Sequence, residues 1–273
     1  MNTFPKINLP RLEQSIAEMA RFGIKSNGGC CRIALTDEDK QGRDRFVEWC
    51  TEAGCQVHVD AFGNIFAVRC GSDGDSGMVL TGSHLDTQPN GGKLDGVYGV
   101  LAGLEVIRTL NDHNIRTSRP IVVIDWTNEE GARFSPGLTG SSGFSGHIDI
   151  GAASAITGAD GKNFIAELGR IGYAGSMDRD AIKPAAYIEL HIEQGPVLER
   201  CRREIGVVTG VQGVRWYEVD VSGSDRHAGT TPMDDRQDSF FAVARMAEAM
   251  RRFALSLDSE VRFTIGRVAV QPG

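Results

Sequence analysis

The stretch GSHLDTQPNGGKLDGVYG, residues 82–99, decides the fold because it joins two apolar segments through a glycine-rich loop. The segment before it, MVLTG at 78–82, predicts a short strand, and residues 96–111 predict a strongly apolar helix. Three chemically versatile side chains lie in the loop: His84, Asp86 and Asp95. Because ligands of open α/β sheets bind where strands end, this loop is a candidate functional site.

Apolar periodicity predicts further helices and strands on both sides of this stretch. Helices are expected at 10–22, 37–53 and 160–170, and strands at 120–126, 186–192 and 204–210. Residues 55–69 alternate around Phe62-Gly63-Asn64 and predict a hairpin, whereas 131–146 predicts a Gly/Ser-rich loop. Thr36 and Asp39 form a capping-box pattern before the second helix. The alternation of strands and helices predicts an α/β fold with helices on both faces of a sheet.

The pattern changes near residue 210. Residues 215–222 and 260–270 alternate between polar and apolar, and residues 234–255 between them have the period of an amphipathic helix. This order predicts a smaller, half-exposed sheet, so we place a domain boundary near residue 210.

Composition excludes several classes of protein. The chain has 273 residues, 41% of them hydrophobic, which is enough for a real core. Its net charge of -7 argues against nucleic acid as the main partner. The N-terminus lacks the apolar h-region of a signal peptide, so none is expected. The sequence also lacks a run of about 18 apolar residues, so no membrane span is expected. Six cysteines without a C-x-x-C pair predict reduced thiols and a cytoplasmic protein.

Other segments deliver metal-ligand side chains to the same predicted sheet edge. Glu129 and Glu130 follow the 120–126 strand, and His191 lies near the end of the 186–192 strand, on one face with Glu189 and Glu193. Histidine and carboxylate ligands suit zinc, manganese or cobalt. Within the loop, Asp86 is expected to accept the free ring N–H of His84.

Each of these signals also has an ordinary structural explanation. A lone histidine at a strand end is more often hydrogen-bonded than metal-bound, and Glu129-Glu130 alone could be a solvated pair. The glycines could cradle a phosphate, but the pattern G-x-x-x-x-G-K-[ST] is missing. Only the convergence of several segments on one edge favours a functional site.

Four motifs together resemble a known family. In chain order they are SHLDTQPNGGKLDG, TNEEGARF, HIEQGPVLE and HAGTTPM. They resemble the amidohydrolases of the peptidase M20 group, and more narrowly the N-carbamoyl-L-amino acid hydrolases, β-ureidopropionases and allantoate amidohydrolases. The resemblance implies a zinc-exopeptidase-like catalytic domain at 1–210, with a mixed sheet flanked by helices. It also implies a partial ferredoxin-like α+β lid and dimerisation domain at 211–273.

The resemblance implies two divalent metal ions, which could be Zn, Mn, Co or Ni. His84, Asp95 and His191 match the ligands of one ion. Asp95 matches the bridging ligand, and with Glu130 it matches ligands of the second ion.

The same resemblance implies catalytic and substrate-binding roles. Glu129 matches the general base, and Asp86 matches the residue that orients His84. Gln194 matches a substrate-contacting position. His227 matches a lid histidine that contacts substrate and stabilises the oxyanion, often in the partner subunit's site. By position alone, His227 would instead be a turn-capping residue.

The activity implied is hydrolysis of the carbamoyl C–N bond of N-carbamoyl-L-amino acids or N-carbamoyl-β-alanine, in a homodimer. The pair Gln88-Pro89 favours this branch over allantoate amidohydrolase, and His191 favours it over a metallo-exopeptidase. Family members continue beyond VAVQPG with one more metal-ligating histidine. The alternative of another class is therefore a truncated, non-catalytic remnant that only dimerises.

Overall fold

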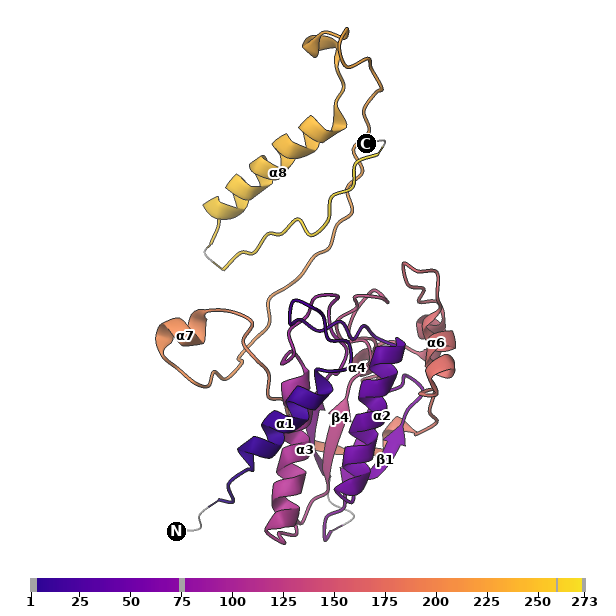
Figure 1. The fold of residues 1–273 in the computed structure, drawn as a ribbon, viewed down its shortest axis with the longest axis vertical. Helices are drawn as coiled ribbons and strands as arrows, with labels where there is room; N and C mark the ends of the chain where they lie inside the picture. Colours follow the sequence, from indigo (N-terminus) through magenta and orange to yellow (C-terminus); the bar gives the residue numbers. More distant parts are fainter. Residues whose placement is uncertain (1–3, 74–76, 259, 272–273) are drawn as a thin grey trace. The chain divides into compact units, whose positions relative to one another are not determined.

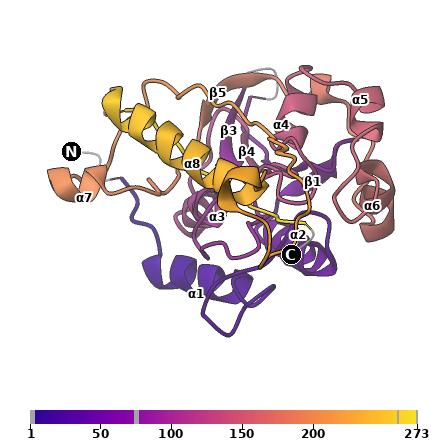
Figure 2. The ribbon, with the colours of Figure 1, turned by 90° about the horizontal axis from the view of Figure 1, so that it is seen from above.

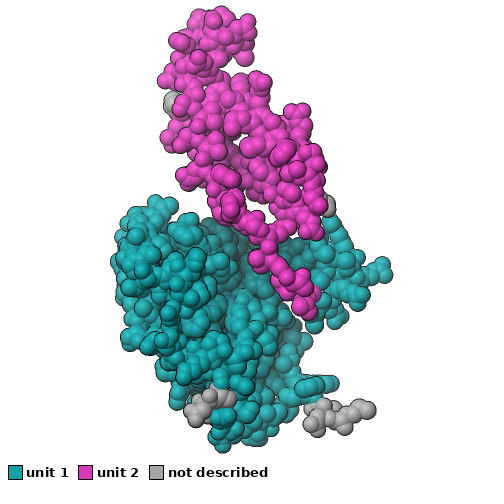
Figure 3. All heavy atoms as spheres, turned by 180° about the vertical axis from the view of Figure 1, so that it is seen from behind, with its two compact units in different colours: residues 1–205 teal, residues 206–273 magenta. Residues whose placement is uncertain are grey.

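The computed structural model describes residues 4–73, 77–258 and 260–271. The chain divides into two compact units, residues 1–205 and residues 206–273, which Figure 3 shows in different colours. The sequence predicts a boundary near residue 210. Each unit is described below by itself.

The first unit is built on a mixed five-stranded sheet with the order β1-β2-β4-β3-β5. Its strands are β1 Gln56–Val59, β2 Ile65–Arg69, β3 Met78–Ser83, β4 Ile121–Asp125 and β5 Pro184–Ile188. β3 runs parallel to both β4 and β5, whereas β2 is antiparallel to β1 and β4. The predicted α/β class and the predicted hairpin at 55–69 are confirmed.

Helices cover both faces of this sheet (Figures 1 and 2). The long helices α1 Leu9–Met19, α2 Asp37–Glu52 and α3 Val97–Asp112 pack on one face. The short helix α4 Thr139–Phe144 packs on the other face, where the Phe144 ring contacts Phe66 and Trp126. Two further helices, α5 Ile150–Ser154 and α6 Phe164–Ile171, pack against each other.

The strand sequences explain why both faces are covered. Successive side chains of a strand point to opposite faces. In β2, Ile65 and Ala67 belong to the core beneath the long helices, whereas Phe66 and Val68 belong to a second apolar cluster on the other face. Because both sets are apolar, neither face of the central strands can be left in water.

Capping residues place the helix ends close to their predicted positions. Thr36 Oγ1 accepts a hydrogen bond from the backbone N–H of Asp39 at the start of α2. The reciprocal bond differs from a capping box, because the Asp39 carboxylate accepts from the backbone N–H of Leu35 instead. Gly54, with φ of 80°, follows the end of α2 in a left-handed conformation that favours glycine.

Three sequence predictions for the segments up to residue 210 are wrong. The strand predicted at 186–192 ends at Ile188, residues 204–210 form no strand, and the loop predicted at 131–146 contains α4. Within the described residues β5 pairs with β3 alone, and their last paired residues are Thr81 and Ile188. Beyond that pair, a strand has no ladder to join. A short helix, α7 Val197–Cys201, follows.

The second unit contains one long helix, α8 Ser239–Ser256, which the sequence predicts at 234–255. Asp238 caps it by accepting a hydrogen bond from the backbone N–H of Phe241. The two strands predicted at 215–222 and 260–270 are not formed in the described residues, because neither segment pairs with a neighbour. The ferredoxin-like lid therefore stays a prediction. Across the described ranges of both units, no helix is both long and apolar enough for a bilayer.

Candidate metal and catalytic site

Three parallel strands end at one edge of the sheet, and the candidate site residues follow those ends. His84 comes directly after β3, Glu129 and Glu130 come shortly after β4, and His191 comes shortly after β5. Parallel pairing of β3 with both neighbours puts all three carboxyl ends on the same side. The convergence expected from the sequence is therefore present in the fold.

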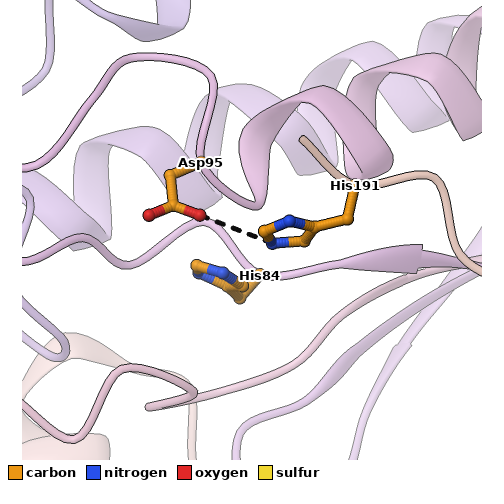
Figure 4. A group of neighbouring side chains, drawn as sticks. All are labelled: His84, Asp95 and His191. Carbon is orange, nitrogen blue, oxygen red and sulfur yellow. Dashed lines mark ion pairs between the residues drawn. The ribbon is translucent and has the colours of Figure 1, made fainter. Parts of the chain in front are cut away.

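His84, Asp95 and His191 form a compact group of metal-ligand side chains (Figure 4). One potential ligand atom from each lies within 4.8 Å of those of the other two. His191 Nε2 lies 3.4 Å from Asp95 Oδ1, and the two imidazole ring centroids are 6.0 Å apart. His84 and Asp95 are buried, whereas His191 is exposed.

Backbone carbonyls set the tautomers of both histidines. His84 Nδ1 lies 2.8 Å from the carbonyl oxygen of Asp86, and His191 Nδ1 lies 2.8 Å from that of Ile192. Because a carbonyl can only accept, each Nδ1 carries a proton and donates it. In the neutral form of each imidazole the lone pair is then on Nε2, the atom that faces the carboxylates of the group.

Asp86 acts differently from the expectation. Its carboxylate Oδ1 lies 3.8 Å from His84 Nδ1, too far for a hydrogen bond, so the backbone carbonyl of Asp86 holds the ring instead. The carboxylate accepts the backbone N–H groups of Glu129 at 3.1 Å and of Glu130 at 3.2 Å. Asp86 therefore links the loop after β3 to the loop after β4.

The two glutamates occupy distinct environments. Glu129 Oε2 lies 3.5 Å from His84 Nε2, beside the group. Glu130 Oε2 accepts a hydrogen bond from Gln88 Nε2 at 2.9 Å, whereas Glu130 Oε1 is buried without a hydrogen-bond partner among the described residues. A buried carboxylate oxygen with no donor fits a cation. Two imidazoles with free Nε2 lone pairs and nearby carboxylates are a donor set that suits divalent zinc or manganese.

Gln194 also reaches the group directly. Its side-chain Nε2 donates to Asp95 Oδ2 at 2.6 Å, so this residue contacts the carboxylate expected to bridge two ions. The backbone of Gln194 has φ of 53°, a left-handed conformation that is uncommon outside glycine.

The structure explains why one loop position, Gly96, requires glycine. Its φ is 64°, and a Cβ atom built there would lie 2.4 Å from the His84 carbonyl oxygen and 2.5 Å from two ring carbons. The His84 ring therefore rests directly on the Gly96 backbone, which only a residue without Cβ allows.

Burial and the neighbouring charges shift the pKa values at the site. Burial raises the pKa of Asp86 to about 7 and raises the pKa of Glu129, and His84 opposes both shifts. For His84, burial lowers the pKa, but the charges of Asp86 and Glu129 raise it by more. The carboxyl of Glu129 therefore binds a proton more readily than an ordinary glutamate does.

His227 lies in the second unit, and the structure describes only its local environment. Its Nδ1 accepts the backbone N–H groups of Gly229 at 3.1 Å and Thr230 at 3.2 Å. This is the turn-capping arrangement that position alone suggests. The same bonds leave the proton on Nε2, which is exposed and can donate.

Two glutamates that the sequence places on the His191 face are engaged elsewhere, because the strand stops at Ile188. Glu189 accepts hydrogen bonds from the hydroxyls of Ser83 at 2.6 Å and Tyr187 at 2.7 Å. Glu193 accepts the backbone N–H groups of Val197 and Leu198 and so caps α7.

Sequence reasoning missed three residues that contact the site or its backbone. Gln88 binds Glu130, and its place in the quoted loop was an available signal. Asp125 ends the apolar strand β4 and accepts the backbone N–H of Leu85, so a lone carboxylate in IVVID was a second signal. Arg32, which contacts the carbonyl of Leu85, gives no sequence signal.

An α/β sheet with imidazoles and carboxylates gathered at one carboxyl edge is typical of metal-binding hydrolases. Residues 80–266 match the model of the peptidase family M20/M25/M40. The chain belongs to this family, and within it to the amidohydrolases related to N-carbamoyl-L-amino-acid amidohydrolase.

Individual relatives agree with this placement. The N-carbamoyl-L-amino-acid amidohydrolase of Rhizobium meliloti is 46% identical over 98% of this chain and 64% of its own length. The allantoate amidohydrolase of Bacillus subtilis is 30% identical over 93% of this chain and 62% of its own length. A hydantoinase/carbamoylase family amidase from Burkholderia vietnamiensis has a similar structure, with a TM-score of 0.87, 47% identity and coverage of 94% and 62%. The chain thus spans just under two thirds of the length of these relatives.

Proposed function

We propose that this chain carries the catalytic site for metal-dependent hydrolysis of the carbamoyl C–N bond of N-carbamoyl-L-amino acids or N-carbamoyl-β-alanine. The observation that carries the proposal is the group His84, Asp95 and His191, with Glu129 Oε2 3.5 Å from His84 Nε2. Relatives named N-carbamoyl-L-amino-acid amidohydrolase support the substrate class.

In the proposed site, His84, Asp95 and His191 would hold one divalent ion, and Glu130, with Asp95, would hold a second. The ions, which could be Zn, Mn, Co or Ni, would supply Lewis acidity that lowers the pKa of a water and polarises the carbamoyl oxygen. The orphaned Oε1 of Glu130 supports its assignment as a ligand.

Glu129 is the proposed general base. It accepts a proton from the attacking water, whose oxygen bonds to the carbamoyl carbon, and passes that proton to the leaving nitrogen. The C–N bond breaks, ammonia leaves, and the remaining carbamate loses carbon dioxide to give the amino acid. The raised pKa of Glu129 supports this role, because a base that returns its proton needs a pKa nearer neutrality.

His227 and Gln194 are the proposed substrate contacts. The exposed Nε2–H of His227 would donate to the developing oxyanion, within the same chain or in the site of a second copy. We propose residues 1–210 as the catalytic domain and 211–273 as part of a lid and dimerisation domain. We also propose a homodimer, as the same resemblance implies, and a cytoplasmic location, which the six free cysteine thiols support.

Ammonia release tests the proposal. The metal-loaded chain is assayed side by side with N-carbamoyl-L-amino acids, N-carbamoyl-β-alanine and allantoate, and Glu129→Gln is the control. Loss of the base is expected to lower the rate by roughly 10²- to 10⁴-fold while metal binding persists. Release that is equal in the control would contradict the assignment of Glu129. Metal binding without release from any substrate would favour a non-catalytic role.

Allantoate is the second candidate substrate. The 30% identity to the Bacillus subtilis allantoate amidohydrolase and the 34% identity to the Arabidopsis thaliana ureidoglycolate hydrolase support a ureide substrate. Faster turnover of allantoate than of every N-carbamoyl amino acid would select this candidate.

A further inference from the structure

Two buried charged side chains hold the backbone of Leu85, the residue between His84 and Asp86. The carboxylate Oδ1 of Asp125 accepts the Leu85 N–H at 2.8 Å, and Arg32 Nε donates to the Leu85 carbonyl at 2.8 Å. Arg32 and Asp125 are fully buried. The peptide units on both sides of Leu85 are therefore fixed by charge-assisted hydrogen bonds, which are about twice as strong as neutral ones.

Arg32 is an unusual residue to find in this position. It takes part in none of the ion pairs of the described residues, and its Nη2 has no hydrogen-bond partner there. Its Nη1 donates to the carbonyls of Met19 at 2.9 Å and Phe22 at 3.0 Å, at the negative end of the α1 dipole. Burying a guanidinium without a carboxylate is costly. An apolar side chain would fill the same space without that cost, but could not donate to Leu85.

Asp125 is held in turn by a buried cation. Arg43 Nη1 lies 3.6 Å from Asp125 Oδ2, and Arg43 also binds Asp39 at 2.9 Å and the carbonyl of Gly63 at 2.9 Å. The side chains of Arg43, Asp39 and Asp125 have no exposed surface. The side chain of Asp125 is thus held in place by Arg43, and its hydrogen bond fixes the position of the Leu85 backbone.

We propose that Arg32 and Asp125 are positioning residues for the metal group, acting through the backbone of Leu85. Leu85 connects His84, whose Nε2 faces the group, with Asp86, whose carbonyl holds the His84 ring and whose carboxylate holds the Glu129 backbone. A shift of Leu85 moves both partners together. The inference rests on the proposed function, because it assigns these residues to a site that binds metal.

Cobalt(II) titration of the full chain, followed by visible absorption, tests the assignment. Arg32→Lys keeps the charge but puts one nitrogen in place of the Nε that donates to Leu85 and the Nη1 that donates to Met19 and Phe22, and Asp125→Ala removes the acceptor. Each is expected to weaken cobalt binding by roughly 10- to 100-fold, as loss of outer-shell partners does. Asp125→Asn keeps an acceptor oxygen for Leu85 and is expected to restore most of the affinity.

A matched control separates positioning from stability. Glu105 is buried on α3 and binds Arg11 and Asn8, away from Leu85, so Glu105→Gln also disturbs a buried charge. Unfolding of every variant is followed by circular dichroism. The expected result is that Glu105→Gln loses stability with unchanged cobalt affinity, whereas Arg32→Lys and Asp125→Ala lose affinity as well.

The outcomes distinguish the two proposals. Equal cobalt affinity in Arg32→Lys, Asp125→Ala and Glu105→Gln would overturn the positioning role and leave the proposed function intact. Failure of the unaltered chain to bind cobalt would overturn the proposed function and the positioning role with it. Should Asp125→Ala not fold, Arg32→Lys alone decides, because it retains the buried cation.

Discussion

Gln194 donates its side-chain amide to Oδ2 of Asp95 at 2.6 Å, while Oδ1 of the same carboxylate lies 3.4 Å from His191 Nε2. The resemblance to the M20 amidohydrolases implies that Gln194 contacts substrate and that Asp95 is a bridging metal ligand. Because the two side chains share a hydrogen bond, the implied substrate contact directly touches the carboxylate of the implied metal ligand. A change at Gln194 is therefore expected to affect metal binding as well as substrate binding.

We expect Gln194→Ala to weaken cobalt binding by roughly tenfold or more, because it removes the hydrogen-bond partner of Asp95, a proposed metal ligand. The measurement is the cobalt dissociation constant, together with KM for the best substrate at saturating metal. A rise in KM with unchanged cobalt affinity would mean that Gln194 contacts substrate alone.

A second prediction concerns the glycine beneath the His84 ring. Gly96→Ala places a Cβ atom 2.5 Å from the ring at a backbone φ of 64°. We expect it to destabilise the fold by more than about 1 kcal/mol, because the conformation disfavours any side chain. The displaced ring is also expected to bind metal more weakly.

The matched control is Gly92→Ala in the same loop, where an added Cβ meets no atom within 4 Å. Thermal unfolding and cobalt titration of both variants check the prediction. Equal behaviour of the two alanine variants would show that the close approach of Gly96 to His84 has no consequence.

A third prediction concerns the buried cation Arg43. Arg43→Met leaves Asp39 and Asp125 buried without a cation, which is expected to cost about 3–5 kcal/mol of unfolding free energy. Arg45→Met on the same helix removes half-buried ion pairs with Glu18 and Glu48 and is expected to cost under about 1 kcal/mol. Urea unfolding followed by circular dichroism compares them. Similar losses would show that burial does not set the cost.

A fourth prediction concerns pH and the Arg11–Glu105 pair. Burial raises the pKa of Glu105, but hydrogen bonds from Arg11 and Asn8 lower it by more, so the net pKa is below the ordinary value. A carboxyl with a lowered folded-state pKa stabilises the fold above its unfolded-state pKa. It loses that contribution as pH falls through the folded-state pKa.

Glu105→Gln is therefore expected to lose about 1.5–3 kcal/mol near neutral pH, as a charged hydrogen-bond partner does. The difference from the unaltered chain should shrink steadily in acid. Urea midpoints measured at several pH values between about 3 and 7 check this. A difference that is independent of pH would show that the charge of Glu105 contributes nothing.

The sequence predicts the parts of the fold that depend on local pattern. α2, α3 and β4 follow from periodicity and end signals, because the same residues that pack the core also set the helix and strand periods. The end of β5 could not be predicted in this way. Its pattern continues to residue 192, but its pairing with β3 stops at Ile188, opposite Thr81, two residues before β3 ends at Ser83.

The candidate site divides in the same manner. His84, Asp95 and His191 follow from strand ends and family motifs, and the structure brings them together. The carbonyl that holds the His84 ring and the guanidinium of Arg32 could not be predicted, because both depend on contacts between distant segments. A residue type at a position does not reveal whether its side chain or its backbone makes the contact.

The pairing of β5 with β3 has a consequence for how the site assembles. β5 is an edge strand whose residues Ala186 to Ile188 pair with Val79 to Thr81, and the ladder is irregular between Met78 and Val79. A slip of one residue would carry the following chain by about 3.3 Å and reverse the faces of its side chains. His191 would then leave His84 and Asp95. A ligand that binds all three residues favours the native alignment of β5 by mass action. Cation binding and strand alignment are therefore thermodynamically coupled.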